Sequence, residues 1–102
     1  MTPEGKVKTK LRRMLSILAP VPYYFCPATG GYGRSGVPDI VGCWEGRYFA
    51  IECKAPGNKP TGLQLKEMEA IQQAGGVAFV FDGQEDWTQD KLVEALRGHY
   101  SR

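Results

Sequence analysis

Apolar residues recur along this chain with two kinds of spacing, and each spacing predicts one kind of secondary structure. Spacings of three and four residues, which place side chains on one face of a helix, occur in segments 3–18, 61–74 and 88–97. Short continuous or alternating apolar runs, typical of strands, occur in segments 23–26, 38–44, 47–54 and 77–81. Pro3 suits the first position of a helix, and Pro20 and Gly75 follow the first two helical segments as stop signals.

The order of these segments predicts an α/β fold with the element order α-β-β-β-α-β-α. Glu45-Gly46 is expected to form a tight turn between the second and third strands, which makes them an antiparallel hairpin. The third strand, the second helix and the fourth strand form a β-α-β unit, which favours parallel strands joined by a right-handed crossover. The sequence therefore predicts a mixed four-stranded sheet flanked by helices.

The length of the chain limits how many domains it can form. At 102 residues we expect one domain over 1–102, because the chain is too short to build a second core. Trp44 and Trp87 are expected in this core or at an interface. No apolar run reaches the roughly 18 residues of a membrane span, and the basic N-terminus continues into an amphipathic helix rather than a signal peptide. We therefore expect a cytoplasmic protein that is not secreted.

Three cysteines, Cys26, Cys43 and Cys53, lie within or beside the apolar runs. Their odd number and the absence of a C-x-x-C motif argue against a disulfide framework. The single histidine, His99, lies far from them near the C-terminus, which argues against a zinc site built on thiolates. The pattern favours buried, reduced thiols.

Charge is unevenly distributed, although the formal net charge is only +2. Segment 1–13 is basic and segment 82–94 is acidic, which permits an anionic partner at one end of the molecule. Lys6, Lys10 and Arg13 form a stripe on the first helix roughly opposite its apolar face. This stripe is either a contact for nucleic-acid phosphates or ordinary solvated surface charge.

Charged residues also interrupt the strand-like segment 36–57, where an unpaired charge is costly. Glu52 and Lys54 share one face of the third strand, and Asp39 begins the preceding strand of the same hairpin. Two carboxylates and one ammonium can therefore meet at one end of the hairpin. One interpretation is a site for a hard divalent cation such as Mg²⁺, with Lys54 acting on a water that attacks a phosphodiester. The alternative is an ion pair between Glu52 and Lys54 at the sheet edge.

Glu4 and Gln64 are further candidates, and each also has a structural explanation. Glu4 falls on the apolar side of the first helix, so its carboxylate faces the core or its rim. Favourable charge at a helix N-terminus explains a glutamate in the first turn but not its angular position. Thr61 and Gln64 fit a capping box, yet Gln64 also lies on the face of Met68, so both interpretations stay open.

These residues and their order resemble a known group of nucleases. Pro38-Asp39 followed by Glu52-Cys53-Lys54, in this order of elements, resembles the PD-(D/E)xK nuclease superfamily. More narrowly, the stretches GVPDIVG, IECK and TGLQ resemble the VRR-NUC (virus-type replication–repair nuclease) family in its small stand-alone form. The resemblance extends from the first helix to VAFVF, most of the chain, and implies a restriction-endonuclease-like core.

The resemblance implies a role for each matching residue. Asp39 and Glu52 would bind Mg²⁺ or Mn²⁺, with the backbone carbonyl of Cys53 as a third ligand. Lys54 would act on the attacking water, and Gln64 would support the site or contact phosphate.

The resemblance also implies a substrate and a partner. Glu4 matches, by position only, a glutamate on the first helix that related Holliday-junction resolvases place beside the metal. The chain would then be an endonuclease of DNA repair that resolves four-way junctions as a homodimer, in a bacterial cell or a phage-infected host. The alternatives are a nuclease acting on flap, fork or ordinary duplex DNA, and a non-catalytic DNA-binding module on the same scaffold.

Two loops carry further candidates for contact with nucleic acid. The glycine-rich loop 27–36 leads directly into Asp39, and its glycines would let backbone N–H groups approach phosphate. Within it, Tyr32 offers a stacking face and Arg34 a positive charge. The alternative is a simple connector. Lys59, in the loop before the second helix, is another candidate phosphate contact.

Overall fold

The computed structural model describes residues 1–28 and 35–100, and it contains the predicted elements in the predicted order. The helices and strands are α1 (Pro3–Ser16), β1 (Tyr23–Phe25), β2 (Ile40–Trp44), β3 (Arg47–Cys53), α2 (Gly62–Gln73), β4 (Val77–Phe81) and α3 (Gln89–Leu96). Each helix begins at a threonine N-cap whose side chain accepts a backbone N–H of the first turn, which explains the sharp helix starts.

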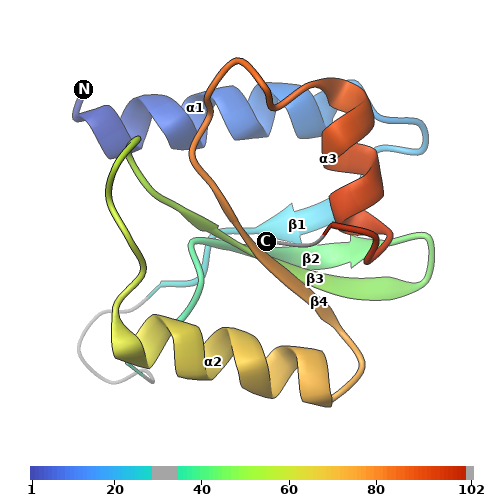
Figure 1. The fold of residues 1–102 in the computed structure, drawn as a ribbon. Coiled ribbons are helices and arrows are strands. Elements are labelled where there is room, and N and C mark those ends of the chain that lie inside the picture. The colour runs from blue at the N-terminus through green and yellow to red at the C-terminus, as the bar shows by residue number, and fades with distance from the viewer. Residues whose placement is uncertain (29–34, 101–102) are drawn as a thin grey trace.

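The four strands form one mixed sheet in the order β1-β2-β3-β4 (Figure 1). β1 and β3 each pair with β2 in the antiparallel sense, and β4 pairs with β3 in the parallel sense. Glu45 and Gly46 join β2 to β3 with φ angles of 53° and 77°, the left-handed backbone that a two-residue hairpin turn requires. The predicted α/β architecture is therefore confirmed.

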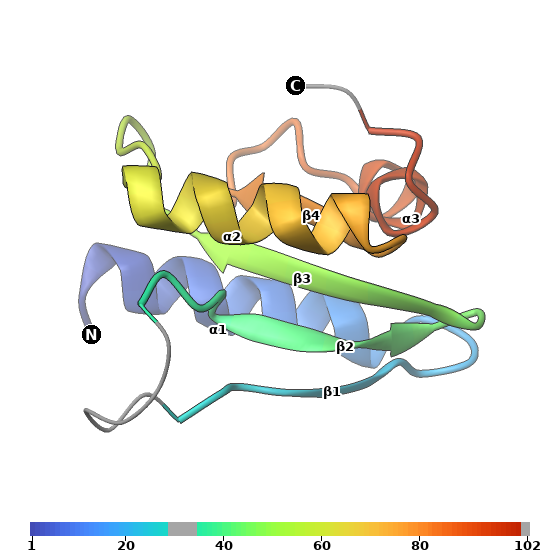
Figure 2. The same cartoon turned by 90° about the horizontal axis from the view of Figure 1, so that it is seen from below.

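Helices cover both faces of the sheet, with α1 and α3 on one side and α2 on the other (Figures 1 and 2). The larger core lies between the sheet and the α1/α3 layer, and it includes both tryptophans, each 5% exposed. A smaller cluster beneath α2 consists of Val41, Ala50, Met68 and Ala78. The expectation that Trp44 and Trp87 are core residues is confirmed.

The prediction for the cysteines is only partly right. Cys53 is buried, and burial raises the pKa of its thiol, so this cysteine remains a protonated apolar core residue. Cys26 and Cys43 are free but exposed, which contradicts the expectation that they are buried. Cys43 lies on the α2 side of the sheet, but α2 packs on β3 and β4 and leaves Cys43 in β2 uncovered. Cys26 directly follows β1, the edge strand of the sheet.

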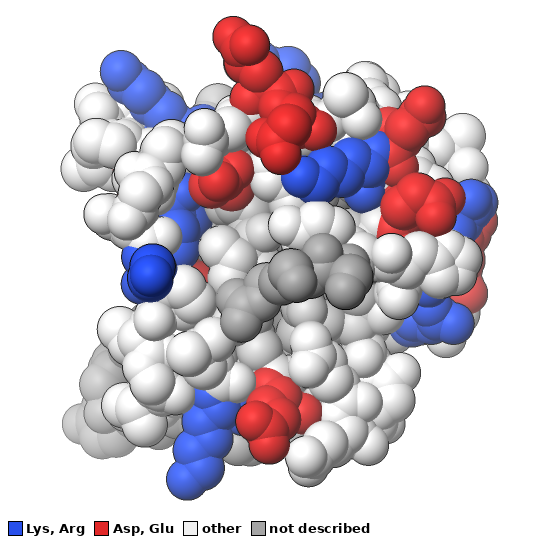
Figure 3. All heavy atoms as spheres, in the orientation of Figure 1, with Lys and Arg blue, Asp and Glu red and all other residues white. Residues whose placement is uncertain are grey.

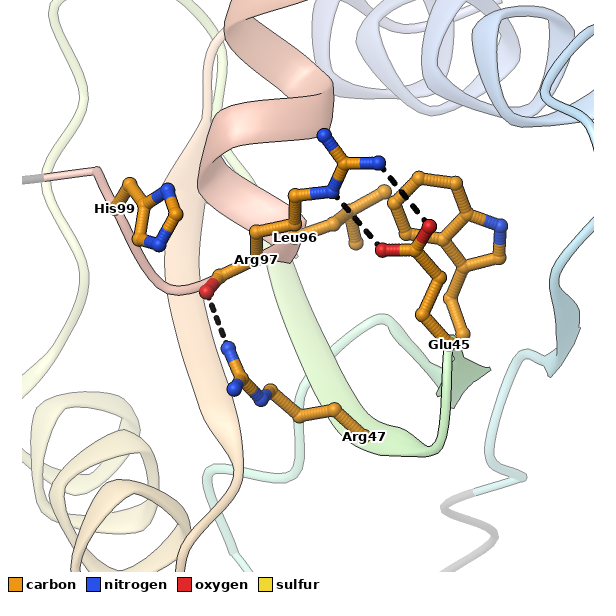
Figure 4. Close-up of a pocket in the computed structure, with 6 residues that line it drawn as sticks. Glu45, Arg47, Leu96, Arg97 and His99 are labelled. Carbon is orange, nitrogen blue, oxygen red and sulfur yellow. Dashed lines mark hydrogen bonds and ion pairs between the residues drawn. The ribbon is translucent and has the colours of Figure 1, made fainter.

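The tip of the β2–β3 hairpin is fastened to the end of α3. Figure 4 shows the Arg97 guanidinium donating two hydrogen bonds to the Glu45 carboxylate, at 2.9 Å and 3.1 Å, while Arg47 donates to the Arg97 backbone carbonyl. The guanidinium of Arg97 also lies 5.5 Å from the centroid of the buried Trp44 ring. These contacts close the end of the larger core that lies opposite the charged residues of the strands.

Acidic side chains gather over the β4–α3 connection and α3 on the face drawn in Figure 3, as the acidic segment 82–94 predicts. Among the described helices, none is long and apolar enough to cross a membrane.

Candidate active site

Three carboxylates from separate segments meet at one end of the sheet. Glu4 lies in the first turn of α1, Asp39 comes just before β2, and Glu52 is the second-last residue of β3. One carboxylate oxygen from each lies within 4.8 Å of the other two. This is the end at which α1 and α2 begin and β3 ends (Figure 2). The structure therefore brings together the three acidic residues that the sequence singled out.

Asp39 is held in place by the neighbouring strand. Its Oδ2 accepts a hydrogen bond of 2.9 Å from the backbone N–H of Cys53, at the end of β3. The preceding Pro38 is buried and fixes the entry of the chain into β2. Because Cys53 directly follows Glu52, the bond that orients Asp39 also ties it to the backbone that carries the second carboxylate.

Glu52 is the buried member of the cluster, with 2% of its surface exposed. Its Oε1 accepts a hydrogen bond of 3.3 Å from the Gln64 side chain, whereas its buried Oε2 has no hydrogen-bond partner among the described residues. Burial raises the pKa of Glu52 to about 8, the Asp39 carboxylate adds to this rise, and the charge of Lys54 partly opposes it. An isolated carboxylate is costly at such a position unless it is protonated or beside a cation.

This donor set fits a hard divalent cation. Carboxylate oxygens are the preferred ligands of Mg²⁺ and Mn²⁺, and the cluster offers three of them within reach of one another. Within residues 1–28 and 35–100, the buried oxygen of Glu52 has no partner, and a bound cation would supply one. A metal would also favour the ionised form of Glu52, which burial and Asp39 disfavour.

Gln64 caps α2 and also contacts the carboxylate cluster. Its Oε1 accepts the backbone N–H of Thr61 at 2.8 Å, and Thr61 Oγ1 accepts the backbone N–H of Gln64 at 3.2 Å, which completes the capping box. Its amide nitrogen remains available and donates to Glu52. The cap thus fixes which end of the amide group points to the carboxylate.

Lys54 lies half-buried just beyond the end of β3. Its backbone N–H donates to the Phe81 carbonyl at 3.1 Å, which fixes the backbone position where β3 leaves the sheet. The positive charge of Lys54 lowers the pKa of the Glu52 carboxyl. The hydrogen-bond partner of Glu52 Oε1, however, is Gln64, and Oε2 has no partner among the described residues. A simple pairing of Glu52 with Lys54 therefore does not account for the buried charge.

Sequence reasoning missed Lys8. Its ammonium lies 3.6 Å from Asp39 Oδ1, and the side chain is 37% exposed. Lys8 follows Glu4 by four residues, so both side chains leave α1 on the same face, one helical turn apart. Once Glu4 was assigned to the inner side of the helix, this spacing was a signal that could have identified Lys8.

The described candidate contacts for nucleic acid lie on α1 and in the loop before α2. Lys6, Arg13 and Lys59 are exposed, the first two on α1 and the third in the loop before α2. Lys10 is partly buried, and its ammonium donates to the Gly83 carbonyl at 2.6 Å, so it links α1 to the segment after β4. Two other candidates, Tyr32 and Arg34, lie outside the described residues.

Comparison with known proteins finds both a similar solved structure and a similar curated protein. A solved structure described as "VRR_NUC domain" shares the fold with a TM-score of 0.72 and 28% sequence identity, over 92% of this chain and 97% of that chain. A curated protein named "Putative nuclease p44", from Acyrthosiphon pisum secondary endosymbiont phage 1, is 44% identical over 54 residues, or 52% of this chain. That match spans 58% of the length of the phage protein. A search of family models found no match.

The structural match extends over nearly the whole chain, and it confirms the expected restriction-endonuclease-like fold.

Proposed function

We propose, from the confirmed resemblance of this chain to VRR-NUC domains in fold and sequence, that it is a metal-dependent endonuclease hydrolysing phosphodiester bonds in DNA. The observation that carries the proposal is the buried Glu52, whose Oε2 has no partner among the described residues, beside Asp39 and Glu4. A carboxylate cluster of this kind, on the scaffold of a nuclease family, is suited to holding a divalent cation at a phosphodiester.

Each residue of the cluster has a proposed role. Asp39 and Glu52 would hold Mg²⁺ or Mn²⁺ together with the backbone carbonyl of Cys53, and Glu4 would complete the anionic side of the site. A bound ion of this type lowers the pKa of a coordinated water and stabilises charge that develops on phosphate. Gln64 keeps Glu52 oriented through its hydrogen bond.

Lys54 would act on the reacting groups. It follows the metal-binding strand and lies close enough to influence the charge of Glu52. A lysine in this position can orient the attacking water, accept its proton, or stabilise the negative charge that grows on the phosphorus centre. These roles belong to the transition state, so Lys54 should contribute more to rate than to DNA affinity.

Branched DNA is the proposed substrate, and two copies of the chain are the proposed active unit. A four-way junction has near two-fold symmetry, so a C2 dimer can present one site to each of two opposed strands. Lys6, Arg13 and Lys59 are exposed and would contact phosphates. As expected from the sequence, Arg34 would add a positive charge and Tyr32 a stacking face. The work would take place in the cytoplasm of a bacterial cell or a phage-infected host, in DNA repair.

The test is cleavage of labelled four-way junction, flap and linear duplex DNA, with Mg²⁺, with Mn²⁺ and with a chelator. We expect metal-dependent cleavage with the junction cut fastest. Asp39→Asn should abolish cleavage and weaken metal binding measured by calorimetry, while Asp90→Asn, an exposed position on α3, should behave as wild type. Cleavage by Asp39→Asn at the wild-type rate would contradict the ligand assignment, and equal cutting of all three DNAs would remove the preference for junctions.

A further inference from the structure

The side of the sheet that carries α2 is only partly covered. α2 packs against β3 and β4, while β1 and β2 lie beside it without a helix in front of them (Figure 2). β1 is also the edge strand of the sheet, so its outer backbone edge pairs with no other described strand. An uncovered sheet face next to an open strand edge is a surface where another chain can add to the fold.

Aromatic side chains occupy this uncovered area in cross-strand rows. Residues that pair across antiparallel strands share a face, and the pairings align Tyr23 with Cys43 and Cys43 with Tyr48. The next row contains Phe25, which pairs with Val41 from the cluster beneath α2, so both rows face the α2 side. We call Tyr23, Phe25, Cys43 and Tyr48 the open face; its three aromatic residues are 73%, 52% and 47% exposed.

We propose that the open face is the surface through which two copies of this chain associate about a two-fold axis. The proposal deepens the proposed function, on which it rests for the need of two active sites, but the surface itself is argued from the structure. In this dimer, the edge strand β1, which carries Tyr23 and Phe25, would lie at the centre of the interface. The partner is a second copy of the chain rather than nucleic acid.

The charge of the open face favours a second copy over DNA. None of its four residues is charged, whereas a surface that binds DNA presents lysine or arginine to the phosphates. Glu67, on α2, is close enough for its charge to raise the pKa of Tyr48, after the larger effect of burial. A two-fold contact places a patch against itself, and a neutral patch avoids the repulsion that like charges would cause there.

The size of the open face also suits an interface. An aromatic side chain carries about 150–250 Å² of surface, so the exposed fractions leave on the order of 300 Å² of aromatic surface in one patch. This is the size at which the largest apolar patch of a monomer often has a function. It is a little over a third of the roughly 800 Å² that each partner buries in a standard interface, and polar rim residues would supply the rest.

An apolar groove continues the open face toward α2. It has a volume of about 450 Å³ and lies between Val41 and Tyr48 on the sheet and Ile71 and Ala74 on the helix. Energetically important contacts usually place an aromatic anchor of one partner in a pocket of the other. In a two-fold assembly, the groove of each copy is available to an aromatic side chain from the open face of the other.

Light scattering tests this inference without any measurement of nuclease activity. The wild-type chain should have twice the 11.3 kDa mass of one chain, and the double variant Tyr23→Ser/Phe25→Ser should have the mass of a monomer at the same concentration. Loss of two such anchors is expected to weaken dimerisation at least about 100-fold. The control Ile17→Ser removes an apolar residue of similar exposure, 66%, at the end of α1 in the opposite layer, and should remain dimeric.

The possible results separate this inference from the proposed function. Circular dichroism should show that the double variant keeps its fold, because both side chains are largely exposed. A monomeric wild type, or a double variant that remains dimeric, would overturn the inference even if the protein cuts DNA. A dimer that the double variant disrupts would support it even if no DNA is cut. A monomeric wild type that loses affinity for unpaired DNA on the same substitutions would assign the face to base stacking instead.

Discussion

At the scale of single residues, the protonation of Glu52 decides what the site can hold. Its burial, the neighbouring Asp39 and the lack of a partner for Oε2 in the described part of the chain all disfavour an isolated negative charge, so a proton or a metal ion relieves the same cost. Gln64 adds a neutral hydrogen bond that positions the group without cancelling its charge. Protonation of Glu52 and metal binding at Glu52 therefore exclude each other, so a metal ion must displace the proton to bind.

The first prediction concerns the stability of the metal-free protein. The pKa of Glu52 is raised from 4.5 to about 8 in the folded state, so the folded protein holds this proton more tightly than the unfolded chain does. The stabilisation is complete below pH 4.5 and is lost as the pH rises through about 8. In a chelator, the melting temperature of wild type should therefore fall relative to that of Glu52→Gln between pH 5 and pH 9.

Two controls sharpen this measurement. Glu85→Gln, at an exposed position before α3, should show a pH profile parallel to that of wild type. Saturating Mg²⁺ above pH 8 should raise the melting temperature of wild type more than that of Glu52→Gln. Parallel profiles for wild type and Glu52→Gln in chelator would mean that the folded protein does not shift the pKa of this group.

The second prediction concerns Lys8, whose ammonium lies 3.6 Å from Asp39 Oδ1. A phosphate held at Asp39 would lie beside this charge, so Lys8→Ala should slow single-turnover cleavage about 10-fold, the effect of roughly 1.4 kcal/mol. The affinity for the metal should stay equal or rise, because a positive charge beside the carboxylates has been removed. Arg12→Ala, at an exposed position of α1 with no assigned role, is the matched control, and identical rates for both variants would reject the assignment.

At the scale of the elements, the periodicity of apolar residues was sufficient to predict the helices, the strands and their order. It also predicted that Asp39 and Glu52 meet and that Glu4 lies on the side of α1 toward them, although the Glu4 side chain is exposed in the structure. It could not predict how far α2 extends across the sheet, so Cys43 was wrongly expected to be buried. A strand pattern shows which residues share a face, but coverage of that face depends on the placement of a distant helix.

The third prediction tests how closely β1 approaches β2. Gly42 lies in β2 opposite Tyr24, and a Cβ at this position would lie 2.1 Å from the Tyr23 carbonyl oxygen and 2.8 Å from the Tyr24 Cα. Both contacts involve backbone, so the strands must separate. Gly42→Ala should lower the free energy of unfolding by at least about 1–3 kcal/mol, measured by urea denaturation.

A glycine with free space around it provides the control for this substitution. A Cβ at Gly62, the first residue of α2, would have no neighbour within 4 Å, and its φ is not in the left-handed region. Gly62→Ala should therefore be neutral or slightly stabilising. If Gly42→Ala is as stable as Gly62→Ala, the close packing of β1 on β2 is not a feature of the protein in solution.

At the scale of the whole molecule, the N-termini of two helices and the C-terminal end of one strand lie at the same end of the sheet. α1 and α2 both begin at the end where β3 finishes, so the partial positive charge of two helix N-termini lies near the three carboxylates (Figure 2). This arrangement stabilises the clustered carboxylates. Because the net charge is only +2, DNA binding should depend on local cations rather than on the field of the whole protein.

The last prediction follows from this local origin of DNA affinity. The double variant Lys6→Ala/Arg13→Ala should reduce the slope of log affinity against log salt concentration by about 1.8 in magnitude, because each lost phosphate contact removes roughly 0.9. Phosphate contacts carry no base information, so the loss should be the same for junctions of different sequence. Lys91→Ala is the control, since Lys91 pairs with Asp86 at 2.8 Å on the acidic side of the molecule. An unchanged slope in the double variant, or an equal change in the control, would show that α1 does not contact the phosphates.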